Sequence, residues 1–220
     1  MAFPYVCLRP HDPAWFPPTT AADSEGLVAY GGDLHPARLL AAYQRGIFPW
    51  FNDDEVPLWW SPDPRCVLRP DGLRIAHSMR SVLRNGAFEL RVNTACAAVI
   101  DGCRTTVRPE QDGTWITAEV AAAYLTLHRQ GVVHSAEAWQ NGRLVGGLYG
   151  VWLGRVFFGE SMFSHVPNAS KFAFIKWVQH VQAAGVALID CQVETAHLRS
   201  LGAELMPRPA FEARLRELLT

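Results

Sequence analysis

A carboxylate, a thiol and an amide stand side by side at Asp190, Cys191 and Gln192, directly after the apolar run Val186–Ile189. The run is short and follows Gly185, so it predicts a buried strand. Because ligands collect where strands of α/β proteins end, the three polar groups predict a functional site there. The alternative is that Asp190 and Gln192 only cap the helix that follows.

A second acidic side chain, Glu160, follows the aromatic pair Phe157 and Phe158. A carboxylate beside large apolar side chains is costly unless it is paired or takes part in chemistry. If the fold brings Glu160 close to Asp190, the two acids form a negative pocket suited to a cationic ligand. The alternative is an ordinary acid on a surface loop.

The thiol of Cys191 raises the question of a nucleophile, with His134 or His197 as its base. Successive side chains of an extended segment point to opposite faces. We expect Asp190 and Gln192 to point outward together, so Cys191 is expected to face the interior and to serve packing. The packing interpretation is favoured over the nucleophile.

The composition of the chain limits the classes of protein to which it can belong. The chain has 220 residues, 49% hydrophobic and 19% charged, and a net charge of −1, which describes a globular protein without a dominant basic surface. Five cysteines without a C-x-x-C pair argue against a disulfide framework or a structural zinc site, and we expect no metal. No apolar run reaches the ~20 residues of a membrane span and no secretory signal begins the chain, so we expect a cytoplasmic protein.

Turn residues and periodicity divide the chain into two predicted units. The proline-rich turn at 61–64 places the boundary near residue 62, which gives a small N-terminal domain, 1–62, and a larger domain, 63–220. In the larger domain, three strands around the hairpin signal Asn141-Gly142, a long helix at 170–184 and the strand at 186–189 predict a mixed α/β (α+β) fold with a central, mostly antiparallel sheet. That order resembles the N-acetyltransferase arrangement, although a fold does not give a function.

Several aromatic and basic residues are candidates for contacts with a nucleobase and with phosphates. Tryptophans in predicted loops or at element ends stack on nucleobases in other proteins, at ~1–3 kcal/mol each, although packing is the alternative for every one of them. The candidates are Trp50, Trp59, Trp60 and Trp115, with Tyr43 and Phe51. On a predicted helix, Arg74, Arg80 and Arg84 are candidates for weak phosphate contacts, the alternative being a solvated face.

Ordered blocks of the sequence resemble the leucyl/phenylalanyl-tRNA–protein transferases. The blocks are residues 31–34, 42–51, 58–65, 113–117, 144–151, 159–164, 168–171 and 188–192. The resemblance implies an aminoacyltransferase that moves Leu or Phe, with Met as a further candidate, from charged tRNA to the α-amino group of proteins with N-terminal Arg or Lys. It implies that these proteins are marked for degradation by the N-degron pathway. It also implies a small N-terminal domain, an acetyltransferase-like C-terminal domain, no cofactor and a monomer.

The resemblance also implies roles for particular residues. Asp190, Gln192 and Glu160 are expected to serve peptide-bond formation. The aminoacyl-adenosine end is expected to contact Tyr43, Trp50 and Trp115. The hydrophobic pocket for the Leu or Phe side chain is expected to consist of Leu148, Met162, Phe174, Trp177 and Ile189. Thr195 departs from the family pattern, in which asparagine is expected.

The implied reaction is the attack of an amine on an activated ester. An α-amino group has a pKa of about 7.7–8.0, so about 10–20% of it is already neutral at pH 7. Orientation of two reactants contributes ~7–11 kcal/mol, so positioning should outweigh base strength. Neutral Gln192 suits this because its carbonyl oxygen accepts a hydrogen bond from the amine.

Two rival classes of function remain. One is a coenzyme A-dependent acyltransferase, which is disfavoured because residues 165–170 lack a glycine-rich turn. The other is a non-catalytic module that binds the tRNA end.

Overall fold

The computed structural model describes residues 6–10, 12, 14–53, 55–106 and 114–220. The N-terminal part of this range forms a four-stranded sheet in the order β1–β2–β4–β3, in which only β1 and β2 are parallel. Its elements are β1 (Val6–Leu8), β2 (Leu27–Gly31), α1 (Pro36–Tyr43), β3 (Phe48–Pro49) and β4 (Leu58–Trp60). Proline at the first position of α1 suits a helix start, because its missing N–H is not needed there.

The larger sheet has seven strands in the order β11–β5–β10–β9–β8–β7–β6. The strands are β5 (Arg65–Leu68), β6 (Glu89–Val92), β7 (Val133–Gln140), β8 (Arg143–Leu153), β9 (Val156–Ser164), β10 (Leu188–Gln192) and β11 (Glu204–Met206). Every neighbouring pair is antiparallel except β9 and β10, which are parallel. The predicted mixed α/β fold with a mostly antiparallel sheet is therefore confirmed.

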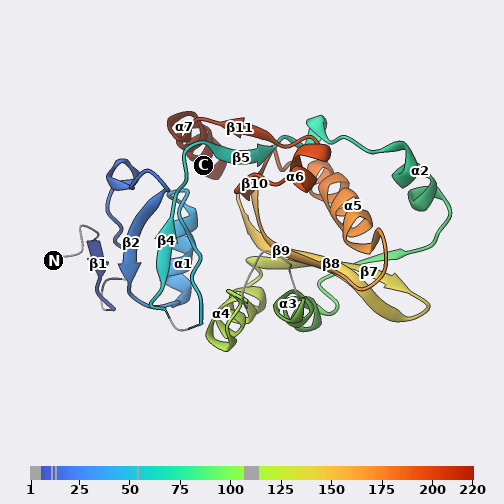
Figure 1. Cartoon of the computed structure of the whole chain (residues 1–220), viewed down its shortest axis with the longest axis horizontal. Coiled ribbons are helices and arrows are strands. Elements are labelled where there is room, and N and C mark those ends of the chain that lie inside the picture. Colours follow the sequence, from blue (N-terminus) through green and yellow to red (C-terminus); the bar gives the residue numbers. More distant parts are fainter. Residues whose placement is uncertain (1–5, 11, 13, 54, 107–113) are drawn as a thin grey trace.

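Helices cover both faces of the larger sheet (Figure 1). The helices are α2 (His77–Arg84), α3 (Cys96–Thr105), α4 (Ala118–Arg129), α5 (Ala169–Ala183), α6 (Ala196–Ser200) and α7 (Arg208–Leu219). Helices α3 and α4 pack on one face, and α5, which matches the predicted long helix, packs on the other. Among the described residues, no helix combines the length and apolarity that crossing a membrane requires.

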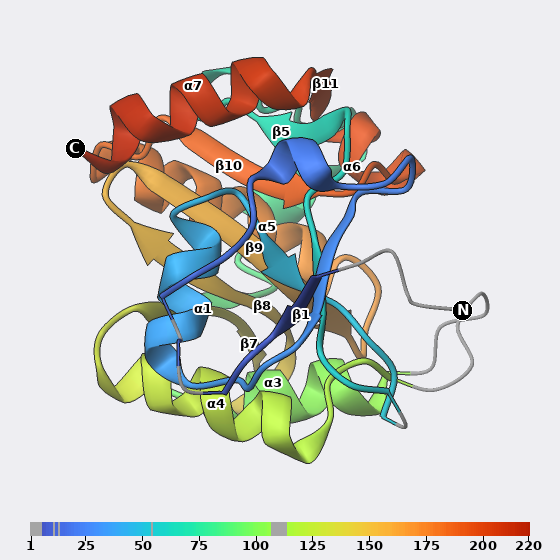
Figure 2. The ribbon, with the colours of Figure 1, turned by 90° about the vertical axis from the view of Figure 1, so that its left-hand side faces the viewer.

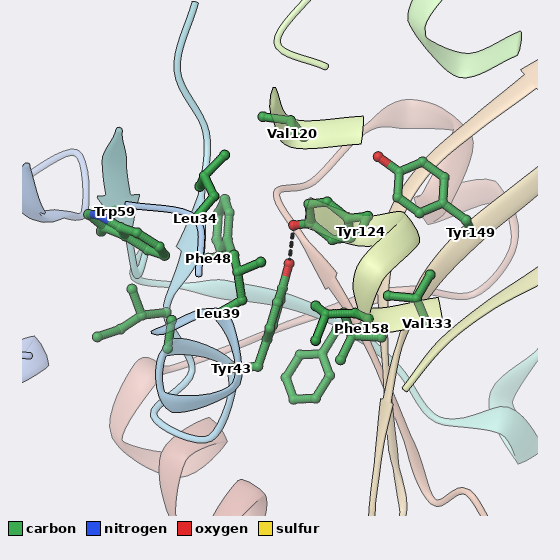
Figure 3. Close-up of a cluster of buried hydrophobic side chains, with 14 of the residues drawn as sticks. Leu34, Leu39, Tyr43, Phe48, Trp59, Val120, Tyr124, Val133, Tyr149 and Phe158 are labelled. Carbon is green, nitrogen blue, oxygen red and sulfur yellow. Dashed lines mark hydrogen bonds between the residues drawn. The ribbon is translucent and has the colours of Figure 1, made fainter. Parts of the chain in front are cut away.

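The two sheets meet at a short turn and share one core. The small sheet ends at Trp60 and the larger one begins at Arg65, while the domain boundary at residue 62 stays a prediction. Figure 3 shows Tyr43 of α1 pointing at Tyr124 of α4, with a hydrogen bond between their hydroxyls. The ring of Tyr43 also lies 5.1 Å from that of Phe158 on β9. Apolar side chains from both sheets thus exclude water together.

The last helix fastens this junction. In Figure 2, α7 lies along one side of the molecule, next to β11 and β5. The backbone N–H of Arg208 donates to the Asp63 carboxylate at 3.0 Å, and the Arg208 guanidinium donates to the carbonyl oxygen of Ser61 at 2.7 Å. Because both acceptors belong to the turn between the sheets, α7 fixes the path of the chain as it enters β5.

A buried carboxylate away from this junction provides a test of the fold. Glu137 of β7 has no exposed surface and accepts hydrogen bonds from the N–H groups of Thr94, at 2.9 Å, and Ala95, at 2.8 Å, the two residues just before α3. Burial alone would raise the pKa of Glu137, but hydrogen bonds, above all those from Thr94, outweigh it and hold that pKa below its usual value. The charged form is therefore the one that the fold stabilises.

We predict that Glu137→Ala lowers the free energy of unfolding by about 2–4 kcal/mol at pH 7, because several buried donors lose their acceptor. The loss should shrink as the pH falls below about 4.3, the usual pKa of a glutamate, because the unfolded wild-type chain then binds a proton, and it should vanish once the native carboxylate is protonated too. Urea denaturation at several pH values measures both effects. Glu25→Ala, which removes an exposed carboxylate from the turn before β2, is the matched control and should leave stability unchanged. Equal stability of Glu137→Ala and wild type would contradict the prediction.

Candidate active site

Strand β10 places the three polar residues differently from the sequence-based expectation. The strand runs from Leu188 to Gln192, so it includes the polar residues that were expected to follow it. Its pairing with β5 shifts register between Asp190 and Gln192, and Gln192 has a φ of 63°, in the left-handed region that bulky residues rarely adopt. The irregularity breaks the alternation of side chains.

As a result, Asp190 is fully buried, whereas Cys191 and Gln192 both line a cavity. The expectation that Asp190 and Gln192 share an outward face, with Cys191 on the buried face, is wrong. The capping alternative is also wrong. The side chain that caps α6 is that of Thr195, which accepts a hydrogen bond from the Leu198 N–H at 3.2 Å.

The cavity has a volume of about 570 Å³ and opens between the two sheets. Apolar side chains from β8, β9, α5 and β10 form one wall, and aromatic side chains from β3 and the segment before α4 form another. The first group includes Leu148, Met162, Phe174 and Ile189, and the second includes Phe48, Trp50 and Trp115. Glu160, Cys191 and Gln192 add polar groups, and Thr195, His197 and Leu198 complete the rim near α6. A volume of this size lies in the range of small-molecule sites.

Most of the expected substrate-binding residues line this cavity, but two do not. Trp50, Trp115, Leu148, Met162, Phe174 and Ile189 are at its surface. Trp177 is instead fully buried one layer behind, with its ring 5.1 Å from that of Phe157, which does line the cavity. Tyr43 is also fully buried and does not line the cavity, although its hydroxyl contacts that of Tyr124 and contributes a hydrogen bond to Glu160. These two positions correct the sequence-based expectation.

The structure also divides the other aromatic candidates into buried residues and residues that a nucleobase can reach. Trp59 and Phe51 are buried in the small sheet's core, and the Trp59 indole N–H donates to the carbonyl oxygen of Gly31 at 2.9 Å. Trp50 is 42% exposed, with its ring 6.0 Å from that of Trp60. The Trp60 indole N–H donates to the backbone carbonyl of Trp50 at 2.6 Å and so supports it. Trp50 thus remains available for stacking, while Trp59 and Phe51 serve packing.

Glu160 is the acid of the cavity. It accepts a hydrogen bond from the Tyr124 hydroxyl at 2.9 Å and another from the side-chain N–H of Gln192 at 3.1 Å. Burial raises the pKa of the Glu160 carboxyl to about 7 against the opposing effect of hydrogen bonds from Tyr43, Tyr124 and Gln192, and the nearby charge of Asp190 adds to the rise. Glu160 is therefore poised to gain or lose a proton near neutral pH, which is typical of functional carboxylates.

Asp190 pairs with a residue that the sequence did not single out. Its two carboxylate oxygens accept from Nε and Nη2 of Arg65, at 2.8 and 2.7 Å, and both side chains have no exposed surface. Asp190 also accepts from the backbone N–H of Gln192 at 2.9 Å. Glu160 and Asp190 both accept hydrogen bonds from Gln192, but only Glu160 lines the cavity. The expectation that both acids form a negative pocket is therefore corrected.

The surroundings of the Cys191 thiol disfavour the thiolate form that a nucleophilic attack requires. A hydrogen bond with the Cys66 thiol and burial raise the pKa of Cys191 well above its usual value, so the thiol stays protonated. Of its two candidate bases, His197 lines the cavity, whereas His134 faces Trp152 on the far part of the sheet, with ring centroids 5.3 Å apart. These surroundings favour the packing interpretation.

The three arginines that were candidates for phosphate contacts do not all lie on one helix. Arg80 and Arg84 lie on α2 and are exposed, but Arg74 precedes the helix, so the three do not share one helix face. In Figure 1, α2 lies at one edge of the molecule, beyond α5.

Within the described ranges, no group of three or more His, Cys, Asp or Glu side chains is arranged to hold a metal ion.

Comparison with known proteins places this chain in a family of aminoacyl-tRNA–protein transferases. The family model described as leucyl/phenylalanyl-tRNA protein transferase matches residues 67–216, and the model for its N-terminal domain matches residues 32–63. The chain therefore belongs to the leucyl/phenylalanyl-tRNA–protein transferase family.

Curated relatives agree with this assignment. The leucyl/phenylalanyl-tRNA–protein transferase of Myxococcus xanthus is 53% identical over 208 residues, which cover 94% of this chain and 89% of the relative. That of Aromatoleum aromaticum is 55% identical over 214 residues, which cover 96% and 88%. The resemblance seen in the sequence blocks is thereby confirmed, and the chain is a transferase.

Similarity to solved structures is more distant. The C-terminal domain of a putative lysylphosphatidylglycerol synthetase from Agrobacterium fabrum has a TM-score of 0.46 at 12% identity, covering 81% of this chain and 65% of that one. A GCN5-related N-acetyltransferase from Kribbella flavida has a TM-score of 0.37 at 12% identity, covering 76% and 60%. Likenesses this weak say nothing about the activity of this chain.

We predict that Tyr124→Phe raises the pKa of Glu160 above its value of about 7, because the carboxylate loses a donor that stabilises its charged form. Titration followed by NMR of ¹³C-labelled glutamate carboxyls measures the shift. Tyr30→Phe removes a hydroxyl on β2, in the small sheet, and should leave the titration unchanged. An unchanged or lower pKa of Glu160 in Tyr124→Phe would show that the hydrogen bond does not stabilise the carboxylate.

Proposed function

We propose that this protein transfers Leu or Phe from charged tRNA to the α-amino group of proteins with N-terminal Arg or Lys. The observation that carries the proposal is the meeting, in one cavity, of an apolar wall with the hydrogen-bonded pair Glu160 and Gln192. Membership of the transferase family supports it. The modified proteins enter the N-degron pathway in the cytoplasm, and the enzyme acts as a monomer without a cofactor.

The donor occupies the apolar and aromatic parts of the cavity. The Leu or Phe side chain packs against Leu148, Met162, Phe174 and Ile189. The terminal adenosine stacks on Trp50 and Trp115, which also line the cavity. Phosphates further along the tRNA meet the exposed side chains of Arg80 and Arg84 on α2, at weak contacts.

Gln192 and Glu160 receive the attacking amine. Because the Gln192 side-chain N–H donates to Glu160, the amide is oriented, and its carbonyl oxygen accepts a hydrogen bond from the neutral α-amine. The amine nitrogen forms a bond to the ester carbonyl carbon, and the bond from that carbon to the ribose oxygen breaks. The proton that the amine loses passes to ionised Glu160, whose pKa of about 7 suits this exchange, and from there to the ribose oxygen, which leaves as a hydroxyl.

Asp190 has an indirect role in this scheme. Its carboxylate is occupied by Arg65 and by the backbone N–H of Gln192, so it orients Gln192 and does not itself contact the amine. The negative charge that receives the cationic acceptor is then that of Glu160, which lines the cavity.

The direct test is transfer of labelled Leu from charged tRNA to a peptide that begins with Arg. We predict that Gln192→Ala lowers kcat roughly 100-fold, because the amine loses its orienting partner. Gln130→Ala, at the exposed end of α4, is the matched control and should retain full activity. Full activity in both Gln192→Ala and Asp190→Ala would overturn the roles proposed for them.

The same assay separates the rival functions. A coenzyme A-dependent acyltransferase would bind coenzyme A in calorimetry and would form no peptide product from charged tRNA. A module that only binds the tRNA end would bind charged tRNA without forming product. Either result would contradict the proposed function.

Specificity provides a second prediction. Met162→Ala shortens a side chain of the apolar wall and so enlarges the cavity. The ratio of kcat/KM for Phe to that for Leu should rise about tenfold, since a pocket distinguishes substrates that differ by about one methylene group by ~1–3 kcal/mol. Competition between Leu-tRNA and Phe-tRNA measures the ratio. Met79→Ala shortens a buried methionine of α2 that does not line the cavity, so it should leave the ratio unchanged. An unchanged ratio in Met162→Ala would remove Met162 from the acyl pocket.

A further inference from the structure

Arg65 is a buried cation at the point where the chain enters the larger sheet. It is the first residue of β5, which lies between β11 and β10. Its side chain has no exposed surface and does not line the cavity, so it cannot contact a substrate in this structure. Any effect of Arg65 on the reaction must therefore pass through other residues.

The guanidinium group is held on two sides by aromatic rings. Its central carbon lies 4.7 Å from the centre of the Phe48 ring and 4.8 Å from that of Phe211. Phe48 belongs to β3 of the small sheet and lines the cavity, while Phe211 belongs to α7. A planar guanidinium stacks on such rings and also forms a fork with a carboxylate, which a lysine ammonium cannot do.

The fork fixes the carboxylate that holds Gln192. Arg65 contacts both oxygens of Asp190, at 2.8 and 2.7 Å, and one of these oxygens also accepts the Gln192 N–H at 2.9 Å. That N–H belongs to a residue with a φ of 63°, a conformation that needs support from its surroundings. Arg65 thus restrains the backbone of the residue whose side chain reaches Glu160.

Stability alone is a poor explanation for this pair. The Nη1 atom of Arg65 is buried and has no hydrogen-bond partner among the described residues. An ion pair removed from water is often no more stable than apolar residues of the same volume, and an unsatisfied donor makes it less so. The geometry of the fork is what an apolar pair would not supply.

We propose that Arg65 is a positioning residue for peptide-bond formation, and that α7 takes part through Phe211. Arg65 holds Asp190, Asp190 holds the backbone of Gln192, and Gln192 presents its amide to the attacking amine. Helix α7 keeps Phe211 against the guanidinium because Arg208 fastens its start to the turn at Ser61 and Asp63. The inference rests on the proposed function.

The test is a comparison of kcat and KM in the transfer assay. Arg65→Lys keeps the charge but loses the fork, so kcat should fall at least about tenfold while KM for charged tRNA changes less than roughly twofold. Arg69→Lys, at an exposed position just after β5, is the matched control and should keep both constants. A folded Arg65→Lys with wild-type kcat, or with a change confined to KM, would overturn the proposal.

A second variant decides the question if Arg65→Lys does not fold. Phe211→Leu leaves Arg65 in place and removes one ring from its clamp, so kcat should fall several-fold with KM unchanged. Phe16→Leu replaces a buried ring that packs on Trp59 and is not one of the two rings on Arg65, so it should leave kcat unchanged. Wild-type kcat in folded Phe211→Leu would overturn the proposal. A wild-type protein that transfers neither Leu nor Phe would contradict the proposed function, which is a different result from an active enzyme with an active Arg65→Lys.

Discussion

Two opposite charges without any exposed surface, on Arg65 and Asp190, face each other through two hydrogen bonds at the junction of the two sheets. Neither charge is tolerable in the interior alone, because the penalty for removing an ion from water amounts to several kcal/mol. The pair therefore fixes the start of β5 against the end of β10. Since Asp190 also holds the Gln192 N–H, the position of the cavity's amide depends on this ion pair.

The polar groups around Gln192 have different tasks because their surroundings differ. Asp190 is surrounded by donors and is fully buried, which suits a structural anchor. Glu160 faces the cavity, and its pKa of about 7 follows mainly from burial. Such separation of neighbouring carboxylates by environment is a general way in which one site obtains both a fixed charge and a proton acceptor. In the proposed reaction, orientation of the amine outweighs the strength of any base.

The cavity belongs to neither sheet alone. Phe48 and Trp50 come from the small sheet's part of the chain, whereas Glu160 and Gln192 come from the larger sheet. The hydroxyls of Tyr43 and Tyr124 join the two parts inside the shared core (Figure 3), and α7 joins them on another side (Figure 2). A change in the packing between the sheets would therefore move the aromatic wall relative to the polar pair.

Local patterns in the sequence were sufficient for the fold class, the long helix α5 and the family, because periodicity and motif blocks are properties of neighbouring residues. They also indicated Glu160, Gln192 and six of the eight expected substrate-binding residues as neighbours of one cavity. Only the tertiary structure decided that Asp190 is buried, that Cys191 lines the cavity and that Trp177 lies behind it. For Asp190 and Cys191 the physical reason is that a register shift at Gln192 breaks the alternation on which the sequence argument relied. Arg65 was missed because its partner stands 125 positions away in the chain, and no local pattern records such a pairing.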